Sequence, residues 1–386
     1  MANHNNNHTL PLHNTGHDPL SQPLLAHSSA DGSGTKLKEI SKKMSLLDRY
    51  LYVWILGVMV ISIVFGYYVQ GVKEAFEVAE IGSVSLPIAI GLWVMMYPVL
   101  CKVQYEILGR LLREARSAKM IGISIVLNWV VGPALMTGLA WATLPDVPNF
   151  RNGVILVGIA RCIAMVLIWN DLAKGDSEYC AILVAINSIL QIILYTPLAL
   201  FYLKVVSGGS GLNVSTWTVA KSVLLFLGIP LAGGALTRLF GILAFGRTWY
   251  QTKFLPFIGP WALIGLLYTI FVMFSIQAEQ IVSNIVNVVR VAVPLVLYFV
   301  IVFFSSLALC WSLKVPYSLA ISQCFTATGN NFELAIAVAV GSFGIDSQEA
   351  LAATIGPLIE VPVLLLFVYV VSFLQKKWPA APSASS

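Results

Sequence analysis

The feature that most constrains the fold of this chain is a succession of apolar segments, each near 20 residues long. From about residue 48 onward these segments follow one another, separated by short polar stretches. A helix of about 20 residues spans the ~30 Å hydrocarbon core of a bilayer and satisfies its backbone hydrogen bonds internally. The sequence therefore predicts an all-α polytopic membrane protein. We expect ten transmembrane helices at residues 50–70, 82–101, 119–143, 152–170, 178–203, 215–241, 255–277, 285–312, 317–343 and 349–374.

Composition agrees with this interpretation and excludes several classes of protein. Hydrophobic residues make up 58% of the chain and charged residues 11%, well below the roughly 25% charged of a soluble domain. The net charge is +5, and the 23 basic residues lie in short clusters rather than along one stripe. No nucleic-acid partner is therefore expected. The five cysteines form no CxxC or zinc-like pattern, which argues against a disulfide framework and a structural zinc site. We expect no cofactor and no resident metal.

Basic residues between the apolar segments predict the orientation of the chain. If the N-terminus is cytoplasmic, the outside loops carry only Lys73, Arg151 and Lys204, and the inside segments carry the other clusters. Cytoplasmic loops are enriched in Lys and Arg, so both termini are expected in the cytoplasm. The plasma membrane and the vacuolar membrane are both compatible with this topology. Nothing in the sequence indicates the oligomeric state.

The predicted helices divide the chain into four parts. Residues 1–47 are rich in Asn, Pro, Ser and Gly and hold all five histidines, which predicts a disordered cytoplasmic tail. Residues 48–203 and 204–375 each contain five predicted helices, and residues 376–386 form a short cytoplasmic tail. Because every histidine lies in the first tail, an intramembrane enzyme with a Cys nucleophile would lack a nearby imidazole base. We therefore do not expect an enzyme.

An internal repeat relates the two five-helix parts. Residues 155–198 can be laid on residues 326–367 at an offset of about 169, with NSILQI falling on GPLIEV. Units with an odd number of helices must have opposite orientations, which predicts two inverted five-helix repeats. Chance similarity between apolar helices is the alternative. The alignment places Cys162 opposite Asn331, inside the fourth and ninth helices, both of which have interrupted patterns. Broken helices of this kind meet near the bilayer midplane, so this crossing is the predicted site.

The fourth helix contributes two candidate residues. Arg161 lies in mid-span, where a charge costs at least a few kcal/mol and needs a partner or a cavity. A structural cation that bridges helix ends is the alternative role. A local break would bring its guanidinium near Cys162 and favour the thiolate of that residue. The alternative for Cys162 is a small buried hydrophobic residue.

The ninth helix contains a dense group of polar residues. Thr328, Gly329, Asn330, Asn331 and Glu333 lie close together in an apolar span. The glycine permits an unwound backbone, and the two amides can bond freed backbone groups or a neutral hydroxylated ligand. Burial disfavours a charged carboxylate, so Glu333 is the candidate proton carrier. The alternative for Glu333 is a static ion pair with Arg161 or Arg290.

Four further polar residues are supporting candidates within the predicted helices. Asn128 lies in the third helix, and Trp169 closes the fourth, where a membrane-interface anchor is the favoured role. Gln191 and Glu360 occupy repeat-related positions in the fifth and tenth helices. Glu360 precedes Pro362 and is expected either to relay protons or to brace a kink.

Three stretches resemble the arsenite permeases of the arsenical-resistance-3 type, in the bile acid, arsenite and riboflavin transporter superfamily. The stretches are GLWVMMYPVLCKVQYE (91–106), GIARCIAMVLIWNDLAKGD (158–176) and ATGNNFELAIAVAV (327–340). The resemblance covers nearly all of residues 48–374. The long polar N-terminal tail looks like an addition seen in eukaryotic, plant-like members.

This resemblance implies a fold and an activity. It implies that helices 4 and 9 are broken and cross, and that a core of helices 3–5 and 8–10 moves against a panel of helices 1–2 and 6–7. It implies that Cys162 is the essential thiol and Glu333 the essential acid. The family exports arsenite, and in some members antimonite, against protons. Arsenite is then a substrate at Cys162, not a resident metal.

A sister branch supplies the alternative function. Sodium-coupled bile acid transporters are similar in helix 9 but place a carboxylate just before the Thr-Gly pair, where this chain has Ala327. Arg161 could supply the positive charge that sodium would otherwise provide. A sodium-coupled organic-anion transporter nevertheless stays open at this point.

Overall fold

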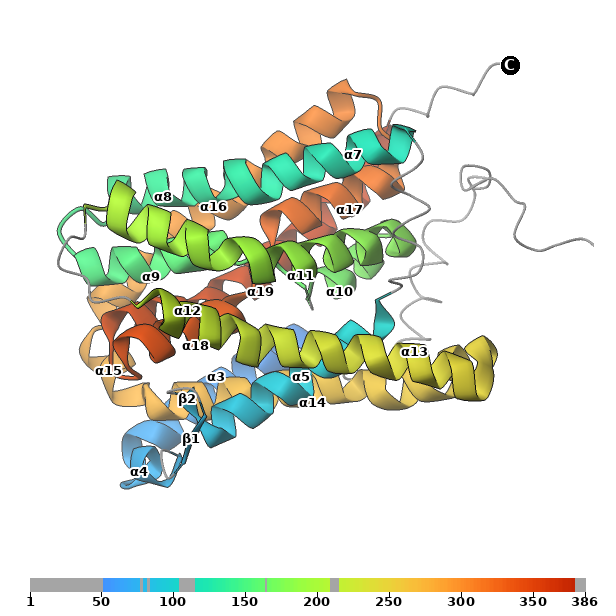
Figure 1. Ribbon diagram of the computed structural model, residues 1–386. Helices are drawn as coiled ribbons and strands as arrows, with labels where there is room; N and C mark the ends of the chain where they lie inside the picture. Colours follow the sequence, from blue (N-terminus) through green and yellow to red (C-terminus); the bar gives the residue numbers. More distant parts are fainter. Residues whose placement is uncertain are drawn as a thin grey trace, which may run out of the picture. The chain divides into compact units, whose positions relative to one another are not determined.

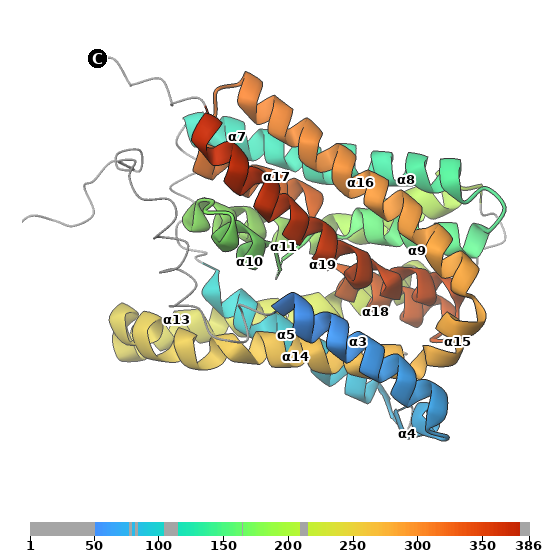
Figure 2. The same cartoon turned by 180° about the vertical axis from the view of Figure 1, so that it is seen from behind.

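The computed structural model describes residues 51–76, 79–81, 84–103, 115–163, 165–208 and 215–378. All of them belong to the unit Leu51–Ser386, and the predicted tail of residues 1–47 lies outside the described residues. The described chain is almost entirely helical (Figures 1 and 2). One short antiparallel hairpin, β1 (Glu80–Ile81) with β2 (Val84–Ser85), precedes the second long helix.

The helices follow the order of the predicted segments. The first part of the chain forms α3 (Leu51–Tyr68), α4 (Val72–Phe76), α5 (Leu86–Lys102), α7 (Ala115–Val126), α8 (Gly132–Thr143), α9 (Pro148–Ile159), α10 (Met165–Leu172) and α11 (Ser177–Leu200). The second part forms α12 (Thr216–Val223), α13 (Ile229–Trp249), α14 (Leu255–Ile276), α15 (Ala278–Ser283), α16 (Ile285–Ser312), α17 (Tyr317–Thr328), α18 (Phe332–Phe343) and α19 (Gln348–Leu374).

Four short stretches of wider, π-type helix interrupt this pattern. They are η1 (Leu127–Val131), η2 (Phe201–Val206), η3 (Leu224–Gly228) and η4 (Tyr250–Phe254). Pro133, Pro230 and Pro256 follow three of them by two positions. A proline lacks the N–H that would bond the carbonyl four residues earlier, and that carbonyl lies inside each stretch. Widening the turn there relieves the clash and explains the location of these bulges.

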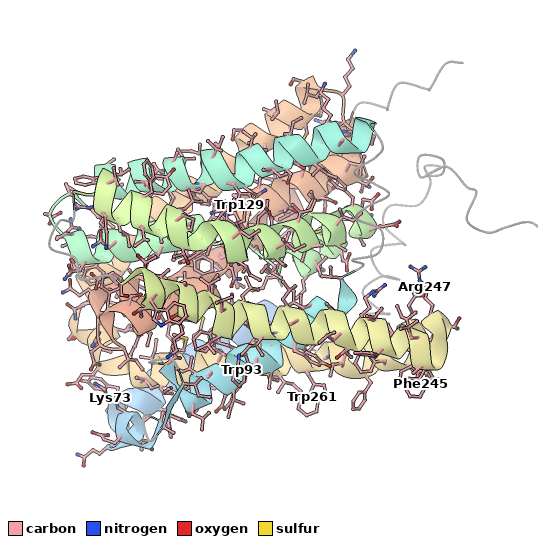
Figure 3. All side chains as sticks on the ribbon, in the orientation of Figure 1. Lys73, Trp93, Trp129, Phe245, Arg247 and Trp261 are labelled. Atoms are coloured by element: carbon pink, nitrogen blue, oxygen red, sulfur yellow. The ribbon has the colours of Figure 1, made fainter. Side chains whose placement is uncertain are left out.

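The sequence from Thr216 to Ile276 contains two predicted helices within one helical stretch. Gly246 divides it, because its backbone adopts φ 83° and ψ 158°, a conformation that is accessible to glycine and costly for other residues. The part of α13 before this point and α14 after it run side by side, in yellow and gold (Figures 1 and 2). Arg247 of α13 and Lys73 of the neighbouring α4 lie near opposite ends of this helix pair (Figure 3).

Five helices of the described residues are long and apolar enough to cross a membrane. They are Ala118–Thr143, Ser177–Val206, Thr216–Ile276, Ile285–Ser312 and Gln348–Lys377. Shorter apolar helices cover Val53–Tyr68, Leu86–Lys102 and Phe332–Phe343. These lengths establish a multi-pass arrangement, and the count of ten spans stays a prediction.

The helices pack in two groups. In the first, α14 lies against α3 and α5, and α13 lies against α5. A Cβ at Gly265 of α14 would lie 2.5 Å from the Met95 nitrogen of α5, so this close contact requires a glycine. In the second group, α9 packs between α8 and α19, and α16 packs on α8, α17 and α19. The second group contains both interrupted helices.

Candidate functional site

Two short extended links lie where the fourth and ninth predicted helices are interrupted. The first joins α9 to α10 and the second joins α17 to α18. Arg161 and Asn330 form an antiparallel bridge between the links. The Cys162 N–H donates to the Gly329 carbonyl at 3.2 Å, and the Asn331 N–H donates to the Ala160 carbonyl at 3.2 Å. The two broken helices therefore meet through their backbones, as the interrupted patterns predicted.

Gly329 makes this close approach possible. A Cβ at this position would lie 2.8 Å from the Cβ of Cys162, 3.3 Å from its sulfur and 3.3 Å from Glu360 Oε1. The Gly329 backbone, at φ −67° and ψ 146°, is extended and open to any residue. The requirement for glycine is therefore steric and does not arise from the backbone freedom that the sequence suggests.

The carbonyl end of α9 is capped by side chains from both links. Asn330 Nδ2 donates to the carbonyls of Val157 at 2.9 Å and Ala160 at 3.0 Å. The Arg161 guanidinium donates to the Gly158 carbonyl. The last carbonyls of a helix lack intrahelical partners and carry partial negative charge, so amide donors and a cation stabilise this end.

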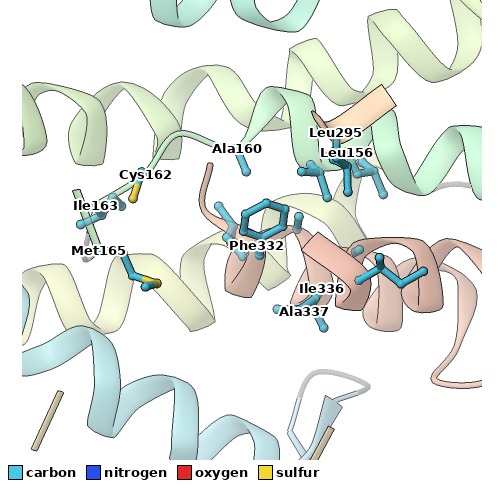
Figure 4. Packing of buried hydrophobic residues seen from close by; sticks show 14 of the residues in the cluster. Leu156, Ala160, Cys162, Ile163, Met165, Leu295, Phe332, Ile336 and Ala337 are labelled. Atoms are coloured by element: carbon cyan, nitrogen blue, oxygen red, sulfur yellow. The ribbon is translucent and has the colours of Figure 1, made fainter. Parts of the chain in front are cut away.

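The amino ends of α10 and α18 are capped in a related way. Asn331 Oδ1 accepts the Leu334 N–H at 3.1 Å, as an N-cap residue does. The Cys162 sulfur faces the backbone N–H groups of Met165 and Val166. Cys162 lies three residues before α10 and Asn331 directly before α18, so both lie near the starts of the second half-helices. Figure 4 shows Cys162, Met165 and Phe332 gathered at this crossing.

Two carboxyl groups lie beside the thiol. Glu333, in the first turn of α18, is 8% exposed, and Glu360 on α19 is 1% exposed. Glu360 Oε1 has no hydrogen-bond partner among the described residues. Both carboxyls are electrostatic neighbours of Cys162 and of each other. A thiol and two acids are thus buried near one another.

Arg161 points away from this thiol. Its guanidinium is fully buried and donates from Nη1 to the Tyr298 hydroxyl of α16 at 2.8 Å. Neighbouring residues of an extended segment project to opposite sides, so the expectation that Arg161 favours the Cys162 thiolate is wrong. The proposed ion pair of Glu333 with Arg161 or Arg290 is also absent from the described residues. Arg290 pairs with Asp146 instead.

Comparison with known proteins assigns the family. The sodium bile acid symporter family matches residues 89–284, about half of the chain. The chain is 48% identical to the arsenical-resistance protein Acr3 of Corynebacterium glutamicum, over 92% of this chain and 96% of that protein. The chain belongs to the sodium bile acid symporter family.

This symporter-family chain is also similar to two further proteins over most of their length. It is 33% identical to the arsenical-resistance protein Acr3 of Alkaliphilus metalliredigens, over 85% of this chain and 92% of that protein. It is 32% identical to an uncharacterized transporter of Synechocystis, over 89% and 93% of the two chains. The chain is thus an integral membrane transporter and not an enzyme. These relatives are bacterial and give no support to the expected eukaryotic, plant-like assignment.

The other residues predicted for this symporter-family site form hydrogen bonds to nearby backbone or are buried between helices. Thr328 Oγ1 donates to the Cys324 carbonyl of its own helix at 2.7 Å. Asn128, in η1, donates to the Ser124 carbonyl at 2.8 Å. Trp169 is 1% exposed, so the interface-anchor prediction is wrong. Because α10 packs against α11, α17 and α19, this indole is enclosed by protein.

Gln191 and Tyr298 have closer contacts with the crossing than the sequence suggested. Gln191 Oε1 accepts the Arg161 backbone N–H, and Tyr298 holds the guanidinium of the same residue. The repeat alignment had marked Gln191 only as the counterpart of Glu360. A single mid-span Tyr in an apolar helix gave no usable signal, because buried tyrosines are common in helix packing.

The crossing of this symporter-family protein contains polar side-chain atoms that are free to form further hydrogen bonds. Within the described chain, Asn330 Oδ1, Asn331 Nδ2, Gln191 Nε2 and Glu360 Oε1 are buried and have no hydrogen-bond partner. Buried polar atoms normally have partners, so this group indicates a polar ligand or water. No set of three or more His, Cys, Asp or Glu side chains in the described ranges is arranged for a metal ion. The site suits a small hydroxylated solute.

Proposed function

We propose that this protein is a secondary active transporter that exports arsenite from the cytosol by proton antiport and alternating access. The observation that carries the proposal is the buried Cys162 thiol, which lies beside unpartnered amide and carboxyl atoms where two broken helices meet. The relatives named as arsenical-resistance proteins support arsenite as the substrate. Antimonite is a second candidate substrate of the same chemistry.

The chemistry of the crossing suits this substrate. Arsenite near neutral pH is mostly a neutral trihydroxide, so hydrogen-bond partners serve it better than a charge clamp. Trivalent arsenic is also a soft acid that prefers thiolate ligands. One thiol, with Asn330 Oδ1 and Asn331 Nδ2 free to bond hydroxyl groups, forms a weak site from which the substrate can leave. Three thiols would bind too tightly for turnover.

Glu333 is the proposed proton carrier. Its side chain is the most exposed of the polar residues at the crossing, at 8%, and it opens the positive end of α18. Desolvation disfavours the charged form of Glu333, and the amino end of the helix favours it. The ratio of charged to protonated Glu333 therefore changes when water reaches the side chain. Opening toward the outer or luminal side would hydrate Glu333, and proton uptake there would accompany arsenite release.

The hydrogen bonds around the links support an inverted repeat as the basis of alternating access. The Arg161 N–H bonds Gln191, and the repeat-related Asn330 N–H approaches the repeat-related Glu360. The two packing groups support the proposal of a panel of helices 1–2 and 6–7 and a core of helices 3–5 and 8–10. Movement of the core against the panel would expose the crossing to either side in turn.

A sodium-coupled organic-anion transporter is the second candidate, favoured by the name of the family. Arg161 argues against it, because a fully buried guanidinium already places a positive charge next to the links. Sodium-dependent uptake of a bile-acid-like anion would support this candidate. We also propose that both termini lie in the cytosol and that the protein resides in the plasma membrane or the vacuolar membrane.

Arsenite flux in sealed everted vesicles with an imposed pH gradient tests the proposed function. Wild-type protein should accumulate arsenite against its gradient and dissipate the pH difference. Cys162→Ala should abolish transport in a protein that inserts and folds normally. Glu333→Gln should stop transport or uncouple it from protons. Full transport by Cys162→Ala, or an unchanged proton dependence in Glu333→Gln, would contradict the proposed roles.

A further inference from the structure

A socket for the Arg161 guanidinium lies on the side of the crossing opposite the thiol. Two residues form it: Tyr298 on α16 and Gly132 at the start of α8. Tyr298 is fully buried, and its hydroxyl accepts Arg161 Nη1 at 2.8 Å. The guanidinium carbon also lies 6.0 Å from the centre of the Tyr298 ring.

Gly132 closes the socket from the third helix. A Cβ there would lie 2.6 Å from Arg161 Nη1 and 3.1 Å from the Tyr298 hydroxyl. The backbone of Gly132 is helical, at φ −58° and ψ −56°, so the conformation does not require glycine. The space that Gly132 leaves open is therefore occupied by the guanidinium and by the hydroxyl that holds it.

The socket keeps a buried cation apart from buried acids. Among the described residues Arg161 forms no ion pair, although Glu360 lies within its electrostatic reach. The titratable groups that face Glu360 are Glu333 from α18, and Arg161 and Cys162 from the first link. An unpaired carboxylate oxygen and a guanidinium would combine if they were free to approach.

We propose that Tyr298 and Gly132 are positioning residues that hold Arg161 at a set distance from Glu360 and Glu333, and thereby set the pH range in which transport operates. This inference rests on the proposed proton-coupled function. Loss of the Tyr298 hydroxyl leaves a buried donor without its acceptor. The guanidinium, which then keeps only its hydrogen bond to the Gly158 carbonyl among the described residues, turns toward the unpaired Glu360 oxygen, and the acids release protons more readily.

Two variants displace the guanidinium from opposite sides of the socket, and each has a matched control. Tyr298→Phe removes only the hydroxyl, and its control is Tyr195→Phe, because the fully buried Tyr195 hydroxyl donates to the Leu156 carbonyl of α9 at 3.1 Å. Gly132→Ala inserts the clashing Cβ. Its control is Gly138→Ala on the same helix, where a Cβ would meet nothing within 4 Å.

Arsenite flux of the purified full-length protein in proteoliposomes is measured between about pH 5 and pH 9. Tyr298→Phe and Gly132→Ala should move the midpoint of the pH profile toward acid by about one unit, because a cation that approaches a buried carboxyl lowers its proton affinity, and a tenfold change in affinity is one pH unit. The two controls should overlay the wild type. A common midpoint for all five proteins, or an equal shift in the controls, overturns the proposal.

A second measurement does not depend on transport. In a background in which the other four cysteines are alanine, the pH dependence of Cys162 labelling by a small thiol reagent reports the local field. Both socket variants should shift labelling toward alkaline pH, since the charged Glu360 carboxylate that they favour acts on the sulfur and disfavours the thiolate. Absence of arsenite flux in the wild type would contradict the proposed function alone. Unshifted labelling in both variants would contradict the socket.

Discussion

Replacement of Gly329 by alanine tests the geometry of the crossing most directly. The added Cβ would meet the Cys162 Cβ at 2.8 Å, and a Cβ cannot rotate out of the way as the end of a long side chain can. The two links must therefore separate by a few tenths of an ångström, which strains the Cys162-to-Gly329 backbone hydrogen bond of 3.2 Å. Overpacking of this kind costs about 1–3 kcal/mol.

The same strain acts on the proposed binding site, because the thiol and Glu360 Oε1 both lie 3.3 Å from the new atom. If the full ~1–3 kcal/mol appears in the transition between states, Gly329→Ala slows arsenite flux by about 5- to 150-fold. Thermal unfolding in detergent and flux in vesicles measure the two effects. The control is Gly122→Ala on α7, where a Cβ would have nothing within 4 Å and helix propensity improves.

The refuting result is specific. Unfolding and flux of Gly329→Ala that both equal those of the Gly122→Ala control would mean that the links do not pack against each other as described. Because the Gly329 backbone is extended, loss of backbone freedom cannot account for a positive result. The experiment therefore isolates the steric contact.

Two further predictions concern ion pairs at the ends of helices. The hydrogen bond from Arg290 lowers the pKa of the exposed Asp146 below its ordinary value of 3.8, so this pair stabilises the fold at neutral pH and loses its effect as the pH falls through that lowered pKa. Arg290→Gln should lower the unfolding midpoint in detergent at pH 7 and should approach the wild type in strong acid; a difference that persists there would contradict the assignment. Lys73 contacts Asp346 at 2.5 Å with both side chains well exposed, so Lys73→Ala should cost less than about 1 kcal/mol. The loss should fade in high salt, and a salt-independent loss would contradict a surface ion pair.

Much of the helical layout follows from the sequence, because its signals are local. Apolar length predicts each span, and interrupted patterns predicted the two links around residues 160–163 and 329–331. Gly246 is the counterexample. It turns one continuous apolar stretch back on itself, and no periodicity distinguishes it from the many glycines that lie inside straight helices.

The identities of the site residues were more predictable than their contacts. Polarity alone marked Arg161, Asn330 and Asn331, since each is costly in an apolar span. Their directions depend on which backbone groups the breaks leave unpaired, and this depends on the other link, about 169 residues away. For this reason the sequence placed Arg161 beside the thiol, whereas the extended link turns it toward Tyr298.

The crossing also explains how a structural break produces a binding site. Each amide uses one side-chain group to cap a helix end and leaves the other unpaired: Asn330 donates from Nδ2 and retains Oδ1, and Asn331 accepts at Oδ1 and retains Nδ2. An apolar residue at either position would leave backbone groups unbonded and would also remove a ligand contact. A substitution there lowers folding and transport together, so only variants that retain the capping atom, such as Asn331→Asp, separate the two. Asn331→Asp preserves the oxygen that accepts the Leu334 N–H and replaces the spare donor with an acceptor. It should therefore fold with α18 capped and yet bind a neutral trihydroxide less well.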